Sequence, residues 1–181
     1  MKFLPTALSD AWIIEPKRIE DDRGFFARTF CEREFAAQGL ETRFPQHSLS
    51  FNKSKGTLRG LHYNAEPDTE TKLIHCTSGV IFDVIVDLRR GSASYGRWTA
   101  VELSADNHRM LYVPRGFAHG FQTLTEACKV SYQISVEYNP DCARGLRHDD
   151  PALAITWPLP VSVMSQRDRS LPGLDDMQTD R

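Results

Sequence analysis

The sequence lacks several features that would assign a protein of this length to a particular class. Lysine and arginine number 22 and aspartate and glutamate 24, so the formal net charge is −2, without the positive excess typical of nucleic-acid binding. The apolar runs Val80–Phe82 and Val84–Val86 are interrupted by Asp83 and Asp87, far short of the ~20 residues of a membrane span. The segment Met1–Pro5 has no apolar core of the signal-peptide kind. We therefore expect a cytoplasmic protein that binds neither nucleic acid nor membrane.

Cysteine is scarce and widely spaced, at Cys31, Cys76, Cys128 and Cys142. No pair has the CxxC spacing of a zinc or redox site, and disulfides are rare in a reducing compartment. These residues are interpreted as small buried or half-buried thiols.

Period-two alternation of apolar and polar residues is the dominant pattern and indicates half-buried strands. It is clearest from Ile81 to Arg89, where Phe82, Val84, Val86 and Leu88 point one way and Asp83, Asp87 and Arg89 the other. Further runs are Ala11–Lys17, Thr57–Tyr63, Lys72–Thr77, Trp98–Leu103, Met110–Val113 and Ala127–Val136. Many short strands separated by turn residues predict an all-β fold, a sandwich or jelly-roll barrel.

One helix is predicted near Cys31–Gln38. Thr29 and Glu32 have the spacing of a capping box, and Gly39 is placed to end the helix. No repeat, low-complexity block or linker divides the chain, so residues 1–181 are expected to form one domain. The polar segment Gly173–Arg181 is expected to be a flexible tail.

Two histidine-containing segments suggest chemistry. In Arg59–Tyr63 (RGLHY), Gly60 leaves room beside His62 for a ligand or a close backbone, and alternation places Arg59 and His62 on opposite faces. In PRGFAHGF at 114–121, the spacing PxGxxH resembles the second half of the cupin metal motif, with His119 as the ligand. The first half is missing, because Asn64 rather than a second histidine follows His62. We therefore expect no metal and no cofactor.

Five segments in this order resemble the dTDP-4-dehydrorhamnose 3,5-epimerase family. They are DDRGFF at 21–26, GTLRGLHY at 56–63, KLIHCTSGVIFDVIVDLR at 72–89, PRGFAHGF at 114–121 and SQRD at 165–168. The resemblance extends from about residue 10 to 172. It implies a cupin-like jelly roll with one or two short helices, and an isomerase that epimerises a nucleotide-linked 4-keto-6-deoxy sugar at C3, C5 or both.

The resemblance also implies roles for four catalytic residues. His62 is the base, and Asp168 orients its imidazole and steadies the imidazolium. Lys72 stabilises the negative charge that develops on the C4 oxygen. Tyr132 matches the acid that returns a proton from the opposite face.

Substrate-binding roles follow in the same way. Arg23 and Arg59 match residues that hold the pyrophosphate, for which a guanidinium fork is suited. His119 matches a substrate-lining position and Tyr138 a base-stacking one. Asp83 also falls in a family motif and is given a supporting role, the alternative being a solvated side chain on the polar face of a strand.

Other positions lie on the nucleotide side by the same analogy. Phe26 belongs to the Arg23 motif, and Arg28 stands where family members often have glutamate. Gln46 and Ser48 occupy a motif that often reads QxN, and Asn64 stands where glutamine is frequent. These departures leave open which nucleotide and sugar are bound.

Alternatives at this point are a metal-dependent cupin oxygenase or isomerase, a non-catalytic sugar-binding barrel, and an epimerase that inverts only one carbon. A homodimer joined by sheet-to-sheet contact is implied by the resemblance, since the run Ala11–Lys17 would otherwise leave an unpaired edge.

Overall fold

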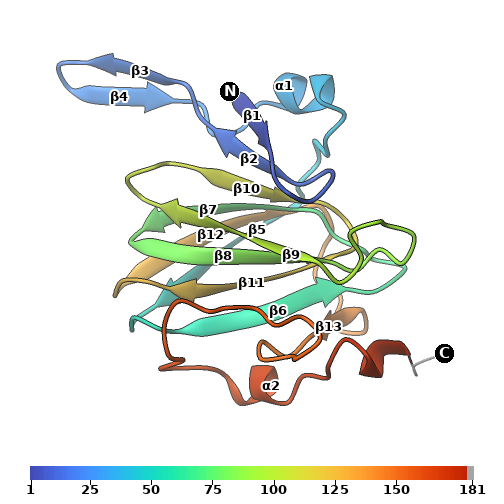
Figure 1. Ribbon diagram of the computed structural model, residues 1–181. Helices are drawn as coiled ribbons and strands as arrows, with labels where there is room; N and C mark the ends of the chain where they lie inside the picture. The colour runs from blue at the N-terminus through green and yellow to red at the C-terminus, as the bar shows by residue number, and fades with distance from the viewer. Residues whose placement is uncertain (179–181) are drawn as a thin grey trace.

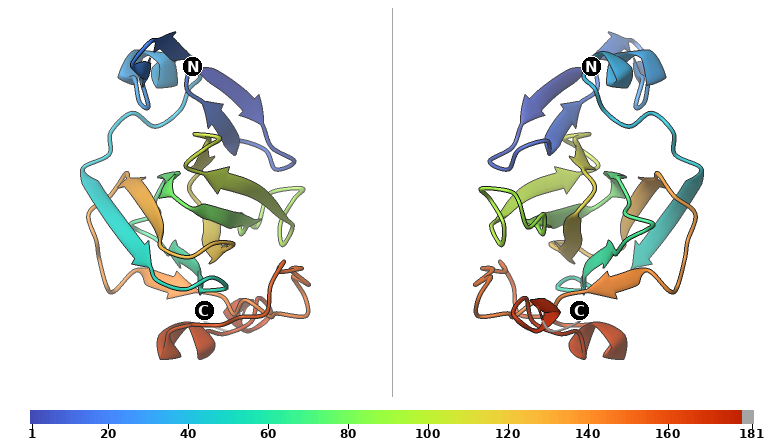
Figure 2. Two further views of the ribbon diagram at one scale, coloured as in Figure 1. Left: turned by 90° about the vertical axis from the view of Figure 1, so that its left-hand side faces the viewer. Right: turned by 90° about the vertical axis from the view of Figure 1, so that its right-hand side faces the viewer.

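The computed structural model describes residues 1–178 and is built almost entirely of antiparallel strands in two large sheets (Figure 1). The first sheet has the order β1 (Lys2–Pro5), β2 (Trp12–Glu15), β10 (Met110–Val113), β7 (Lys72–Ser78), β12 (Cys128–Ile134) and β5 (Gln46–Asn52). The second has the order β13 (Ala143–Gly145), β6 (Leu58–Asn64), β11 (Phe117–Thr123), β8 (Val80–Asp87) and β9 (Trp98–Ser104). The sheets face each other around a common core, as the end-on views show (Figure 2). The predicted all-β jelly roll is confirmed.

Helix is confined to short pieces. α1 spans Glu32–Ala37, α2 spans Gln166–Arg169, and a single 3₁₀ turn spans Asp176–Gln178. In the part of the chain that the structure describes, no helix is long and apolar enough to cross a membrane.

β8 separates two apolar layers, which explains its alternating sequence. One face carries Phe82, Val84, Val86 and Leu88, as predicted. These side chains belong to an apolar cluster that the C-terminal segment covers. The opposite face was predicted to be polar, but Ile81 and Ile85 belong there to the core between the sheets. Asp83 is on this inner face and is fully buried. The alternation therefore distinguishes two buried environments, not core from solvent.

All the predicted strands are present, with ends that differ by a few residues, and the structure adds others. β11 is buried along its whole length, so it has no alternation to detect. β5 was also not predicted. Its apolar residues Leu49 and Phe51 are exposed, at 64% and 50%, so its apolar face does not belong to the core. β1, β13 and the hairpin of β3 (Arg18–Asp21) with β4 (Gly24–Ala27) are too short for periodicity to reveal.

The predicted helix near residue 31 exists, but its predicted cap does not. The N-cap is Cys31, with no side-chain hydrogen bond, and Thr29 lies outside the helix. Acidic residues Glu32 and Glu34 in the first turn favour the helix N-terminus electrostatically. Gly39 ends the helix with φ of +69°, as predicted.

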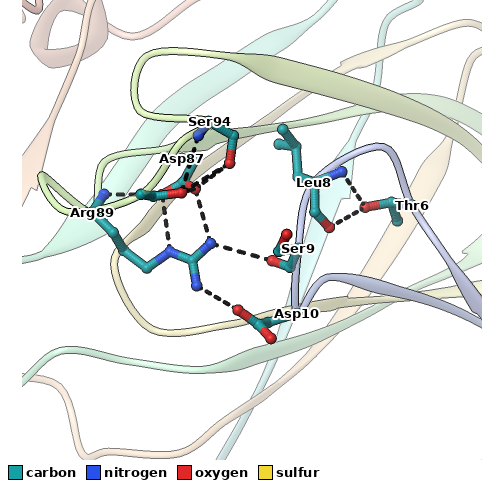
Figure 3. Close-up of polar contacts among 8 residues, drawn as sticks. Thr6, Leu8, Ser9, Asp10, Asp87, Arg89 and Ser94 are labelled. Carbon is teal, nitrogen blue, oxygen red and sulfur yellow. Dashed lines mark hydrogen bonds and ion pairs between the residues drawn. The ribbon is translucent and has the colours of Figure 1, made fainter.

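A charge cluster centred on the buried Asp87 joins the turn between β1 and β2 to the barrel (Figure 3). Asp87 is fully buried and accepts hydrogen bonds from Arg89 Nε and Nη2 at 3.0 and 2.8 Å. Ser92 and Ser94 also donate to it, at 2.6 and 2.7 Å. Arg89 reaches across to Asp10 at 2.6 Å. Burial opposes ionisation of Asp87, but these hydrogen bonds outweigh it and lower its pKa.

Two peripheral segments complete the fold. The β3–β4 hairpin projects from the barrel beside α1 (Figure 1), with Ile19 63% and Phe26 72% exposed. At the other end, part of the predicted tail lies against the barrel: Leu174 is buried and donates its N–H to Asp150. Residues 179–181 of that predicted tail lie outside the described residues.

Candidate active site

A cavity of about 290 Å³ is lined by strands from both large sheets. Among the predicted site residues, it brings together Gln46, Ser48, Arg59, His62, Lys72, His119, Tyr132 and Tyr138. Asp168 lies behind His62. Arg23, Phe26 and Arg28 do not line the cavity.

The orientation of His62 is set by Asp168. His62 Nε2 lies 2.8 Å from Asp168 Oδ1, and Asp168 Oδ2 accepts a hydrogen bond from the Gly60 N–H at 3.2 Å. Ser165 caps α2 by accepting from the Asp168 N–H. Burial alone would raise the pKa of Asp168, but the hydrogen bonds from His62 and Gly60 outweigh it and lower that pKa. An ionised Asp168 holds a proton on Nε2 and leaves Nδ1 of His62 free to accept one from a ligand.

A β-bulge places Arg59 and His62 in the same cavity. Between these two residues the pairing advances three positions on β6 but two on β11, so one extra residue is inserted and the alternation reverses. Gly60 lies in the bulge with φ of +116°, and a Cβ on it would be 2.6 Å from Gly120 Cα. The close backbone predicted beside Gly60 is confirmed. The prediction that Arg59 and His62 face opposite ways is wrong.

Lys72, at the start of β7, lies in a largely buried ion pair that sequence reasoning missed. Its Nζ is 2.8 Å from Glu70 Oε1, and the two side chains are 10% and 11% exposed. The same Nζ donates to the His62 carbonyl at 3.4 Å. Glu70 also lines the cavity. Its position two residues before Lys72, and so on the same face of an extended chain, is a signal that could have found it.

Tyr132 enters the cavity from β12. Burial raises the pKa of its phenol, and the negative charge of Asp83 raises it further. The group is therefore a neutral O–H at physiological pH and is available as a proton donor.

A second histidine–aspartate pair lies next to the first. His119 is the cross-strand neighbour of His62, and its Nε2 lies 2.7 Å from Asp83 Oδ1. Burial raises the pKa of Asp83, with only partial opposition from His119 and Lys72. Asp83 Oδ2 is buried and has no hydrogen-bond partner among the described residues. Asp83 therefore supports His119 and is not the solvated alternative.

The rest of the cavity wall combines apolar side chains with polar and basic ones. Arg59 Nε donates to Asn52 Oδ1 at 2.7 Å, which fixes the guanidinium. Gln46 Oε1 accepts from the Tyr138 N–H at 2.9 Å and so holds the loop that carries this ring. Arg144 and Arg167 also line the cavity and were not predicted.

The three remaining predicted residues belong to the β3–β4 hairpin and the segment after it. Arg23 has a side chain that is 90% exposed and pairs with Asp21 at 2.6 Å. Arg28 pairs with Glu34 at 3.0 Å. Within one chain, these groups are separate from the cavity that holds His62.

Among the described residues, no group of three or more histidine, cysteine, aspartate or glutamate side chains is arranged to hold a metal ion. The four cysteines are unpaired in the structure, as predicted.

Comparison with known proteins identifies the family. A model of the dTDP-4-dehydrorhamnose 3,5-epimerase family matches residues 5–176. The chain belongs to this family. The dTDP-4-dehydrorhamnose 3,5-epimerase of Sinorhizobium fredii is 40% identical and covers 98% of this chain and 91% of its own.

Solved structures agree with this assignment. The crystal structure of the epimerase from Elizabethkingia anophelis has a TM-score of 0.94 at 39% identity and covers 97% of each chain. The dTDP-6-deoxy-D-glucose-3,5-epimerase of Legionella pneumophila, in complex with dTDP-4-keto-L-rhamnose, has a TM-score of 0.90 at 38% identity and covers 96% of this chain and 93% of its own.

Family membership confirms the predicted enzyme class, an isomerase that epimerises a nucleotide-linked 4-keto-6-deoxy sugar. It decides against the cupin oxygenase and the non-catalytic sugar-binding barrel.

Proposed function

We propose that this epimerase inverts both C3 and C5 of dTDP-4-keto-6-deoxyglucose to give dTDP-4-keto-rhamnose. One observation carries the proposal: His62 belongs to the five-stranded sheet and Tyr132 to the six-stranded sheet, yet both line one cavity. Inversion requires removal of a proton from one face of a carbon and delivery to the other. A base and an acid on facing sheets suit that requirement.

The reaction begins with His62. The 4-keto group acidifies the C–H bonds at C3 and C5, and His62 Nδ1 takes the proton while Nε2 stays hydrogen-bonded to Asp168. The electron pair of the broken C–H bond moves into the C3–C4 or C4–C5 bond, and the carbonyl electrons move to the C4 oxygen. The imidazolium that forms is stabilised by the ionised Asp168.

The enolate is then stabilised and reprotonated from the other side. Lys72 donates a hydrogen bond to the C4 oxygen, where negative charge develops in the transition state. The Tyr132 O–H transfers its proton to the carbon from the face opposite His62, and the carbonyl re-forms. His119, held by Asp83, lines the sugar site.

The nucleotide lies along Arg59, Tyr138, Gln46 and Ser48. Arg59 faces the pyrophosphate, because a fixed guanidinium donates two parallel hydrogen bonds to paired oxygens. The Tyr138 ring is 62% exposed and provides a flat surface for the base. No step in this scheme needs a metal or a cofactor.

A second copy of the chain supplies the rest of the nucleotide site. In a single chain Arg23, Phe26 and Arg28 lie away from the cavity, although the family resemblance assigns them to the substrate. The outer face of the six-stranded sheet exposes Leu49 and Phe51, next to cavity residues on the same strand. We propose a homodimer through this face, in which each β3–β4 hairpin reaches the partner's nucleotide.

The whole chain, residues 1–181, is proposed to act as one domain. Its unpaired cysteines fit a reducing compartment, and we place the reaction in the cytoplasm.

The test of the chemistry is deuterium incorporation from D2O into the 4-keto-6-deoxy sugar at C3 and C5. We expect wild-type enzyme to exchange and invert both positions. In His62→Ala the exchange rate should fall about 10²–10⁴-fold at both carbons, because one base serves both. Near wild-type exchange in folded His62→Ala protein would refute the mechanism.

The test of the dimer is complementation between two impaired variants. His62→Ala and Arg23→Ala chains are unfolded and refolded together. If the hairpin acts on the partner's site, each mixed dimer has one site with both His62 and Arg23 intact, so activity returns. If the hairpin serves its own chain, or if light scattering gives a mass near 20.6 kDa, the dimer proposal fails.

A further inference from the structure

Glu70 is a charged group in the catalytic cavity to which the mechanism above gives no role. Its carboxylate is one of the few charges buried in the cavity wall, with a side chain 11% exposed. Burying a carboxylate has a large desolvation cost unless the charge is paired and hydrogen-bonded. One oxygen, Oε1, meets that need through Lys72 Nζ at 2.8 Å.

The Lys72 ammonium is held by two acceptors. Glu70 Oε1 takes one N–H and the His62 carbonyl takes a second, at 3.4 Å. An ammonium has three donors, so one remains for a ligand. Because the first two directions are set, the third is set as well, and Lys72 offers one directed hydrogen bond to the C4 oxygen.

The second carboxylate oxygen, Glu70 Oε2, is available in a complementary way. No described residue donates a hydrogen bond to it, and the atom is not fully buried. Since Glu70 lines the cavity, Oε2 is an acceptor beside the Lys72 donor. The pair therefore presents one donor and one acceptor, side by side, to whatever occupies the cavity.

We infer that Glu70 and Lys72 together recognise an α-hydroxyketone, with Lys72 donating to the C4 carbonyl oxygen and Glu70 Oε2 accepting from the hydroxyl on C3. This inference rests on the proposed function and identifies which sugars it takes. A ketone oxygen is an acceptor, and the hydroxyl on the adjacent carbon is a donor close to it. The Lys72 donor therefore pairs with the carbonyl acceptor, and the neighbouring Glu70 acceptor pairs with the hydroxyl donor.

The hydrogen bond to Glu70 selects against substrates without a C3 hydroxyl. Without that donor, the Glu70 oxygen is desolvated by the sugar and left without a partner. A hydrogen bond to a charged group, or its loss in a buried site, changes kcat/KM roughly 10- to 100-fold. The C5 proton is chemically the same in the 3-deoxy sugar, so exchange at C5 can report on both substrates.

The experiment compares two substrates in three proteins. C5 deuterium exchange is measured on the 4-keto-6-deoxy sugar nucleotide and its 3-deoxy analogue with wild type, Glu70→Gln and Glu70→Ala. Wild type should prefer the hydroxyl substrate roughly 10- to 100-fold in kcat/KM. Glu70→Ala should abolish most of that preference, and Glu70→Gln, which keeps the shape with an uncharged group, should reduce it.

The ratio between substrates separates this role from a structural one. If Glu70 only holds Lys72, both substrates lose activity equally and the preference is unchanged, which would overturn the inference. Glu102→Gln, an exposed carboxylate on β9, is the matched control and should leave the ratio unchanged. If wild type exchanges neither substrate, the proposed function fails instead.

Discussion

Replacing Asp168 with asparagine should disable the base without disturbing the fold, and the structure indicates how. The Gly60 N–H points at one oxygen of Asp168 and His62 Nε2 lies against the other. An asparagine amide has one oxygen and one NH₂. The Gly60 N–H needs an acceptor, so the new amide oxygen turns to Gly60 and its NH₂ turns to His62.

That arrangement selects the wrong tautomer of His62. Nε2 must become the acceptor, and the ring proton moves to Nδ1, which faces the substrate. Forcing the wrong tautomer in a histidine–aspartate pair lowers kcat about 10⁴-fold where the imidazole is enclosed. The His62 side chain is 40% exposed, so water can exchange its proton and soften the effect. We expect a loss in kcat of roughly 10²–10³-fold, or about 3–4 kcal/mol of transition-state stabilisation, with KM little changed.

The assay is the initial rate of C3 and C5 deuterium exchange at saturating substrate, with thermal unfolding as the check on folding. Asp149→Asn makes the same chemical change at a side chain that is 53% exposed and paired with Arg147, and it should retain wild-type exchange. The reasoning is refuted if folded Asp168→Asn protein exchanges within threefold of wild type. It is also refuted if the loss is entirely in KM, since the carboxylate would then serve binding.

Three further predictions follow from other parts of the structure. Tyr132→Phe should remove the acid but keep the base, so deuterium enters with the original configuration; normal inversion at C5 would assign the acid elsewhere, with Tyr138 the first alternative. Arg89→Met should lower the free energy of unfolding by about 2–3 kcal/mol and Tm by roughly 4–12 °C, because the buried Asp87 charge then keeps only two serine hydroxyls and the backbone N–H of residue 89 as donors. The lowered pKa of Asp87 means that its contribution is complete above the unfolded value of about 3.9 and is lost as pH falls through the folded value, so the variant should show a shallower acid loss of stability in pH-dependent unfolding. Dialysis against a strong chelator should leave the exchange rate unchanged, because no group of three or more metal-ligating side chains forms among the described residues; inactivation that zinc, iron or manganese reverses would contradict the metal-free mechanism.

The sequence predicted the architecture because most strands have two chemically different faces. It could not say which face was the core, and β8 shows why. Its polar-looking side carries Asp83 and Asp87, which are fully buried, Asp83 with one oxygen paired to His119 and Asp87 with both oxygens hydrogen-bonded to Arg89. His119 is distant from Asp83 in sequence, and Arg89 lies in the turn after β8. Burial of the two carboxylates therefore depends on pairings that strand periodicity does not reveal.

The candidate site shows the same limit. His62, Lys72, Tyr132 and Asp168 were named from motifs. The structure brings the first three to one cavity and pairs Asp168 with His62, 106 positions earlier in the chain. The bulge at Gly60 was not predicted, since periodicity assumes an unbroken strand, although a glycine inside a strand is a known indicator of one. Glu70 was missed because it belongs to no motif, and only its ion pair with Lys72 in the folded chain draws attention to it.

The placement of the site residues separates chemistry from nucleotide selection. Every group to which we assign a proton transfer or contact with the C4 oxygen lies in or against the barrel of one chain, where strand pairing and buried hydrogen bonds hold it. Two of the three departures from the family pattern lie on exposed surface: Arg28 follows the hairpin, and Ser48 lies on an exposed part of β5. The third, Asn64, is buried at the end of β6 and lines the cavity. Substitutions on exposed surface change stability little, so they can alter which nucleotide is bound without moving the base or the acid. The same barrel can therefore keep one reaction while the hairpin and β5 adapt it to different sugar nucleotides.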